Sequence, residues 1–141
     1  MTAPRREGTV LAAGVLAVAT TLITFLDWGR SGQRSRSSYE LIDIAERAGV
    51  LPERWAAAAN LLYLTPAACG LVLVAAAARR HALVGVATTT LGALVGTAAI
   101  LVARSPLVAE PAARAAVLLG TGTALSGFAV LVAARDEETA G

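Results

Sequence analysis

The sequence predicts an all-α integral membrane protein: a bundle of four transmembrane helices, with a short amphipathic helix in the first extracytoplasmic loop. Three observations support this fold class. Hydrophobic residues make up 56% of the 141 residues before glycine is counted, whereas soluble domains average roughly 45–50% with glycine included. Charged residues make up only 16%, against about 25% in soluble domains. Finally, the apolar residues form four charge-free stretches bracketed by charges, as expected at a membrane boundary, because an unpaired charge in lipid costs several kcal/mol.

The four predicted spans are residues 9–26, 55–78, 82–103 and 115–134, and the whole chain, 1–141, is a single membrane domain. Helices of these lengths reach about 27–36 Å, enough to cross a hydrocarbon core of about 30 Å. None of the stretches alternates between polar and apolar residues, which argues against barrel strands. The first stretch also runs past a small-residue site at positions 17–19, so an uncleaved span is favoured over a signal peptide, whose apolar part is about 7–15 residues long.

The loop between the first two spans, residues 27–54, is the one sizeable polar segment. Gly29 and Gly32 predict a turn at its start. Ser37 and Glu40 have the spacing of a capping box, which predicts a helix over residues 38–48 with an apolar face resting on the bundle or the membrane surface. Gly49 predicts the end of that helix. The loop between the third and fourth spans, residues 105–113, is short and offers no chemistry of its own.

The first loop also holds the candidate interaction residues. Trp28 and Trp55 stand where the first two spans reach the same membrane surface, a position at which tryptophan is enriched. The guanidinium groups of the loop suit phosphate or carboxylate. We therefore expect an anionic group or a partner protein to contact Trp28, Arg30, Arg34, Arg36, Tyr39 and Glu40. The alternative is a solvated loop, because five acidic residues balance its five arginines.

Small residues predict where the spans pack. Gly92 and Gly96 form a G-x-x-x-G pattern in the third span. In the fourth span, Gly122 and Ser126 form a similar pair, and Thr123 and Gly127 form another. Such residues allow helix backbones to approach closely. The pattern leaves open whether Gly92 and Gly96 pack within one chain or between chains.

Pro66 predicts a kink in the second span, because proline cannot donate a hydrogen bond to the carbonyl about one turn before it. That carbonyl lies near Leu62. We expect Thr65 or Asn60 to supply the missing donor.

The contents of the spans exclude several function classes. No ionisable Asp, Glu, Lys or Arg lies within a span, which argues against proton-coupled, ion-coupled and charged-substrate carriers. One histidine, His81, and one cysteine, Cys69, make neither a nucleophile–base pair nor a metal site. We therefore expect no enzyme activity, no cofactor and no metal. The net charge of +2, without a basic stripe, argues against nucleic acid.

The leading functional hypothesis is a non-enzymatic accessory, assembly or interaction subunit of the bacterial cell envelope. Its partners would be membrane lipids and either an envelope protein or further copies of the chain. The alternative is a small oligomeric pore or carrier for a neutral or lipidic solute, with a polar lining formed by Asn60, Tyr63, Thr65 and Thr88 to Thr90.

The orientation in the cell membrane follows from the arginines. Arg5 and Arg6 precede the first span, and Arg79 and Arg80 occupy a very short turn. Both features place the two chain termini in the cytoplasm. A bare count of arginines slightly favours the opposite orientation, because the longer loops on the other side contain more of them.

Overall fold

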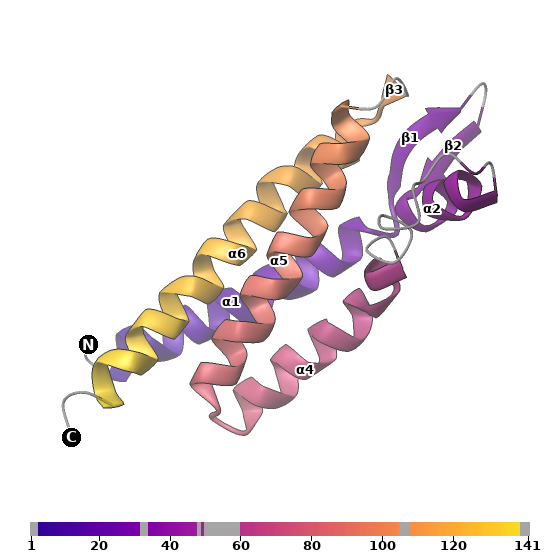
Figure 1. The fold of residues 1–141 in the computed structure, drawn as a ribbon. Helices are drawn as coiled ribbons and strands as arrows, with labels where there is room; N and C mark the ends of the chain where they lie inside the picture. Colours follow the sequence, from indigo (N-terminus) through magenta and orange to yellow (C-terminus); the bar gives the residue numbers. More distant parts are fainter. Residues whose placement is uncertain (1–2, 32–33, 48, 50–59, 105–107, 139–141) are drawn as a thin grey trace.

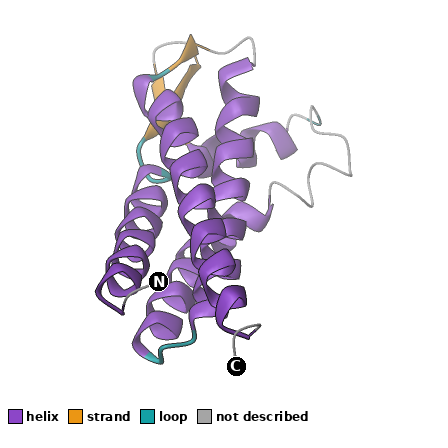
Figure 2. Ribbon diagram, turned by 90° about the vertical axis from the view of Figure 1, so that its left-hand side faces the viewer, coloured by secondary structure: helices purple, strands orange, loops and turns teal. Residues whose placement is uncertain are grey.

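The computed structural model describes residues 3–31, 34–47, 49, 60–104 and 108–138. Its helices are α1 (Ala3–Ile23), α2 (Ser38–Arg47), the 3₁₀ helix η1 (Leu61–Leu64), α4 (Thr65–Ala77), α5 (His81–Arg104) and α6 (Pro111–Glu138). Its strands are β1 (Asp27–Ser31), β2 (Arg34–Ser37) and β3 (Val108–Ala109). The helices α1, α4, α5 and α6 form a bundle in which α1 contacts the other three (Figure 1). Both chain termini lie at one end of the bundle, and the strands and α2 lie at the other (Figure 2).

Two of the helices are long and apolar enough to cross a membrane. By length and composition, these are α5 and the part of α6 from Pro111 to Arg135. The apolar helical segments Glu7–Ile23 and Leu61–Ala77 are shorter. All four coincide with predicted spans, although residues 55–59 of the second span lie outside the described part of the chain.

The helices α5 and α6 pack at backbone contact. A Cβ atom built on Gly92 would lie 2.3 Å from the backbone nitrogen of Ala124, and one built on Gly120 would lie 2.6 Å from that of Gly96. Gly85 and Gly127 repeat this close approach seven residues away on each helix. The predicted Gly92–Gly96 pattern therefore packs within the chain. Its partner is Gly120, however, because a Cβ on the predicted Gly122 would have no atom within 4 Å.

Pro66 stands at the start of a helix and does not kink a continuous one. The 3₁₀ helix η1 ends at Leu64, and Pro66 occupies the first turn of α4, where proline's missing N–H costs little. As predicted, Thr65 compensates. Its hydroxyl donates to the carbonyl of Leu62 over 2.8 Å, and its backbone N–H donates to the same oxygen.

The fold is predominantly helical, as predicted, but the chain also forms a small sheet that was not predicted. The strand order of this sheet is β2-β1-β3, and both pairings are antiparallel. Gly29, predicted to lie in a turn, is paired on both sides, with Arg36 of β2 and Ala109 of β3. The sheet thus joins the two loops, and the strands β1 and β2 occupy part of the segment that the sequence predicted as loop. Residues 32 and 33, including the predicted turn residue Gly32, lie outside the described part of the chain.

Candidate functional site

The polar structure at one end of the bundle is built from both loops. We call it the cap, and it comprises β1, β2, α2, β3 and Glu110. The helix α2 follows the prediction: the Ser37 hydroxyl accepts from the backbone N–H of Glu40 over 3.4 Å, and the Glu40 carboxylate accepts from that of Ser37 over 3.1 Å. This is the predicted capping box. Gly49 has a φ of +63°, which suits the left-handed residue that commonly ends a helix.

Trp28 fastens the cap to the bundle. The register of β1 shifts between Asp27 and Gly29, and Trp28, between them, is fully buried. Its indole nitrogen donates over 2.7 Å to the carbonyl of Ile23 at the end of α1, which also accepts from the backbone N–H of Leu26. Trp28 is therefore part of the core. This corrects its prediction as a surface residue at the membrane interface, and its counterpart Trp55 lies outside the described residues.

A chain of hydroxyl groups connects α2 to two helices of the bundle. The Tyr39 hydroxyl lies 2.9 Å from the hydroxyl of Thr24 and 2.8 Å from that of Thr65. The Ser38 hydroxyl donates to the carbonyl of Thr24 over 2.7 Å. Ser38, Thr24 and Thr65 are all buried. Tyr39, predicted as an interaction residue, thus has its polar atom engaged inside the protein.

Aromatic rings mark the level at which the cap meets the bundle. The ring of Tyr39 lies 5.2 Å from that of Phe25 and 5.3 Å from that of Tyr63, measured between centroids. Phe25 and Tyr63 are both about half exposed. Tyrosine at the end of an apolar helix is typical of a membrane–water interface.

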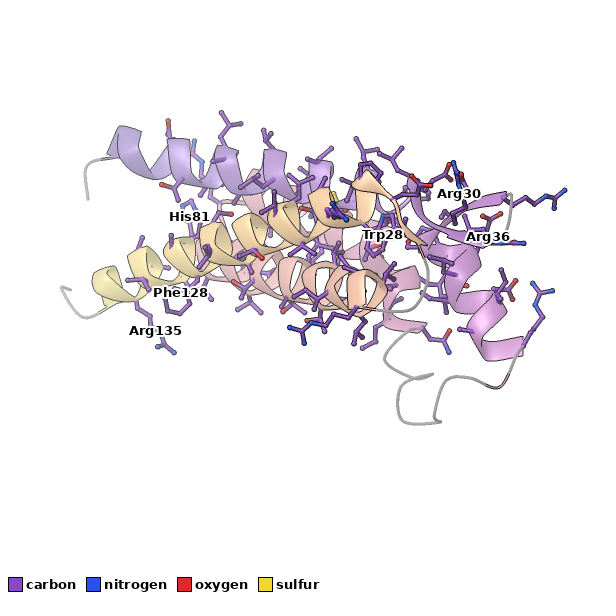
Figure 3. All side chains as sticks on the ribbon, turned by 90° about the horizontal axis from the view of Figure 1, so that it is seen from above. Trp28, Arg30, Arg36, His81, Phe128 and Arg135 are labelled. Atoms are coloured by element: carbon purple, nitrogen blue, oxygen red, sulfur yellow. The ribbon has the colours of Figure 1, made fainter. Side chains whose placement is uncertain are left out.

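The arginines of the hairpin face in two directions. Paired residues of an antiparallel sheet share a face, and alternate residues of one strand share a face. Because Arg36 pairs with Gly29 and Arg34 pairs with Ser31, both of these arginines lie on one face. Arg30 pairs with Ser35 and lies on the other face. Figure 3 shows Arg30 and Arg36 at the cap end of the molecule. The three arginines expected to hold one anionic group are therefore not brought together as a set.

Acidic residues of the protein neutralise two cap arginines. The Arg30 Nε atom lies 3.2 Å from an oxygen of Glu110, which belongs to the loop expected to be without chemistry. Arg47 forms an ion pair with Asp43 one turn away on α2. Arg34 is exposed and Arg36 is half-buried. The Nε atom of Arg36 is buried and has no hydrogen-bond partner.

The residues expected to line a pore are scattered. Thr65 and Thr88 lie in the interior of the single chain, and the Thr88 hydroxyl has no hydrogen-bond partner. Thr90 is exposed and donates to the carbonyl of Val86, while Thr89 donates to that of Gly85. Asn60 and Tyr63 are exposed near the cap end of α4. These side chains are thus divided between the interior and the exterior of the chain.

Residues capable of catalysis or metal binding do not gather. Cys69 is buried in α4, and His81 stands at the start of α5 near the opposite end from the cap (Figure 3). Within the described ranges, no three His, Cys, Asp or Glu side chains lie close enough to hold a metal ion.

Three contributors to this architecture were not predicted from the sequence: Glu110, Gly85 and Gly120. Glu110 donates its backbone N–H to the carbonyl of Trp28 over 3.0 Å, in addition to its ion pair with Arg30. A charged residue between two apolar segments was the signal that could have drawn attention to Glu110, but its contact with Arg30 joins positions 80 residues apart.

Comparisons of the chain with protein-family models, with curated proteins and with solved structures gave no match.

Proposed function

We propose that the chain is a four-span integral membrane protein of the cell envelope that acts by binding, through its cap, as a non-enzymatic interaction subunit. The observation that carries this proposal is an apolar belt around the whole bundle, between two charged ends. Both the membrane insertion and the binding role follow from how the side chains are distributed between the belt and the ends.

The belt includes the two helices that are shorter than a typical span. Large apolar side chains are exposed on each helix of the bundle, for example Leu11 on α1 (70%), Val74 on α4 (67%), Val86 on α5 (51%) and Leu118 on α6 (76%). A soluble monomer rarely exposes apolar patches larger than a few hundred Å². Lipid is the solvent that accommodates such side chains on all sides, which supports counting α1 and the η1–α4 segment as spans together with α5 and α6.

The charged residues lie at the two ends of the belt. Glu7, Arg79, Arg80 and Arg135 belong to the end with the chain termini, and the charged residues of the cap, with Arg104 and Arg114, belong to the other. The stretches between them contain no charged residue. The basic turn at 79–80 and the basic N-terminus support an orientation with both termini in the cytoplasm, which places the cap on the outer surface.

A binding role follows from where recognition is possible. The belt offers only apolar and small side chains, whereas the cap presents polar groups on a scaffold fixed by Trp28 and the hydroxyl chain. Glu40 and Arg47 are exposed on α2, so this helix offers a partner a charged outer surface.

Membrane insertion is tested by alkaline carbonate extraction of membranes. We expect the protein to stay in the pellet. Its release would overturn the proposal.

The binding role is tested by placing a photo-crosslinking amino acid at Glu40 in cells. We expect a discrete protein adduct. The same group at Leu118, in the apolar belt, is the matched control and should give lipid adducts only. An absence of protein adducts at Glu40 and at further exposed cap positions would overturn the binding role.

A further inference from the structure

The arginines of the cap differ in whether an acidic residue of the protein neutralises them. Arg30 is paired with Glu110, and Arg47 is paired with Asp43. Glu40 is engaged by the backbone of Ser37. In the described part of the chain, Arg34 and Arg36 remain without an acidic partner.

These two arginines are arranged as a pair. They stand two residues apart on β2 and share a face of the sheet, so their Cα atoms are about 7 Å apart. Gly29, opposite Arg36, has no side chain to cover that face. The buried Nε atom of Arg36 has no hydrogen-bond partner, and an unpaired buried donor is unfavourable. Two planar forks at this spacing fit the oxygens of a phosphate group.

The position of the pair indicates which phosphate it meets. Leu26, which ends the apolar segment after α1, is exposed. Gly29 follows Leu26 by three residues, which is about 10 Å of extended chain. Arg36 pairs with Gly29, so it stands close to the level at which the apolar segment ends. Tyr39, in the ring cluster with Phe25 and Tyr63, follows Arg36 by three residues. The lipid headgroup layer is about 5–8 Å thick on each side of the hydrocarbon core, and long cationic side chains extend to it.

We propose that Arg34 and Arg36 bind the phosphodiester of an anionic phospholipid in the leaflet next to the cap. This inference rests on the membrane insertion proposed above. Under this proposal the two surfaces of the cap bind different partners. The face of the hairpin that carries Arg34 and Arg36 contacts lipid, and the outer surface of α2 remains available to a protein.

The test is a titration of the detergent-solubilised full-length protein with phosphatidylglycerol, followed by native mass spectrometry. Each cation near an anionic lipid surface contributes ~1 kcal/mol, or about fivefold in affinity. We therefore expect Arg36→Gln to weaken the first binding event about fivefold, and the double change R34Q/R36Q to weaken it about 25-fold. Arg36→Lys should retain part of the affinity, because lysine keeps the charge and loses the fork.

The matched control is Arg47→Gln, which removes one charge from the same cap at an internally paired residue. We expect less than a twofold effect. Equal losses in Arg36→Gln and Arg47→Gln would overturn the proposal, because the lipid would then sense only net charge. Equal binding of phosphatidylglycerol and phosphatidylcholine would also overturn it. Far-ultraviolet circular dichroism checks that each variant folds, and the exposed Arg34→Gln takes the place of the double variant if that one does not.

An acidic protein is the competing partner for the same surface. If R34Q/R36Q left lipid affinity unchanged but abolished a protein crosslink formed in cells, the arginine pair would belong to that protein and the lipid proposal would be overturned. Carbonate extraction separates this failure from that of the proposed function, since a protein retained in the pellet can still lack the lipid site.

Discussion

At the residue scale, the contact between α5 and α6 shows what a small-residue pattern can and cannot predict. Gly92 and Gly96 were predicted to pack and do so. Two pairs on α6 were offered as partners: Gly127 of one pair does contact α5, but Gly122 of the other does not, and the glycine opposite Gly92 and Gly96 is Gly120. Two residues along a helix are about 200° apart around its axis, so this difference moves the contact to the far side of α6. Because small residues occur on several faces of α6, the sequence of one helix does not determine which face meets α5.

Alanine substitutions at Gly120 and at Gly122 test which of these two glycines makes the contact with α5. In Gly120→Ala the new Cβ would meet the backbone of Gly92 and Gly96 at 2.6–2.9 Å. Backbone atoms cannot turn away, so we expect a loss of about 1–3 kcal/mol in unfolding free energy. Gly122→Ala meets nothing within 4 Å and should leave stability unchanged or slightly higher. Denaturant unfolding in detergent micelles, followed by circular dichroism, measures both; equal stabilities would contradict the close contact.

The hydroxyl chain at Tyr39 has fewer hydroxyl protons than hydrogen-bond contacts. Its three hydroxyls, on Thr24, Tyr39 and Thr65, supply three protons for four contacts: two between hydroxyls and two with the carbonyls of Thr21 and Leu62. Tyr39→Phe therefore removes only one hydrogen bond, and both threonines keep their backbone acceptors. We expect a loss of about 1 kcal/mol, measured by the same unfolding assay. A loss above about 3 kcal/mol would mean that Tyr39 holds the cap through more than this bond.

At the element scale, local signals predicted α2 and missed the sheet. The capping box, the apolar spacing and Gly49 all lie within 13 residues, so the bounds of α2 were predicted to within one residue. The strands are rich in Arg, Ser and Gly, which have no strong preference for a sheet. They pair because three chain segments leave the bundle at the same end, and β3 stands about 80 residues from β1. Such a pairing leaves no local pattern to detect.

We expect Trp28 to hold the strands and α2 of the cap against the helical bundle. Trp28→Ala removes a fully buried ring and its bond to Ile23, and such truncations cost about 3–5 kcal/mol. Because the bundle has its own contacts, we expect the hairpin to become sensitive to trypsin at Arg34 and Arg36 while the helical content is retained. Phe128→Ala is the control, since Phe128 is exposed on α6 and its loss should leave the cleavage rate unchanged. Cleavage of Trp28→Ala at the wild-type rate would contradict the role of Trp28 as the anchor.

At the scale of the whole molecule, composition predicted the helical bundle better than it predicted the site. In the part of the chain that the structure describes, the charge-free stretches coincide with the bundle helices α1, α4, α5 and α6. The six candidate interaction residues were chosen by type within one loop, and the structure separates them. Trp28 is buried, Tyr39 and Glu40 make internal bonds, and Arg30 is neutralised by the other loop. The pairing of β1 with β2, together with the ion pair that joins Arg30 to the other loop, shows that Arg34 and Arg36 form the remaining pair.

The sidedness of the proposed four-span arrangement can be measured with single cysteines. Cys69, the one native cysteine, is buried, so Cys69→Ala provides the background. Ser35→Cys places a thiol on the exposed part of the cap, and Ala78→Cys places one in the exposed turn at the opposite end. With both termini in the cytoplasm, a membrane-impermeant maleimide should label Ser35→Cys in intact cells and Ala78→Cys only after lysis. The reverse pattern would invert the orientation and keep the four spans. Labelling of both positions from one side would contradict the four-span arrangement, because the cap and the turn would then share a surface.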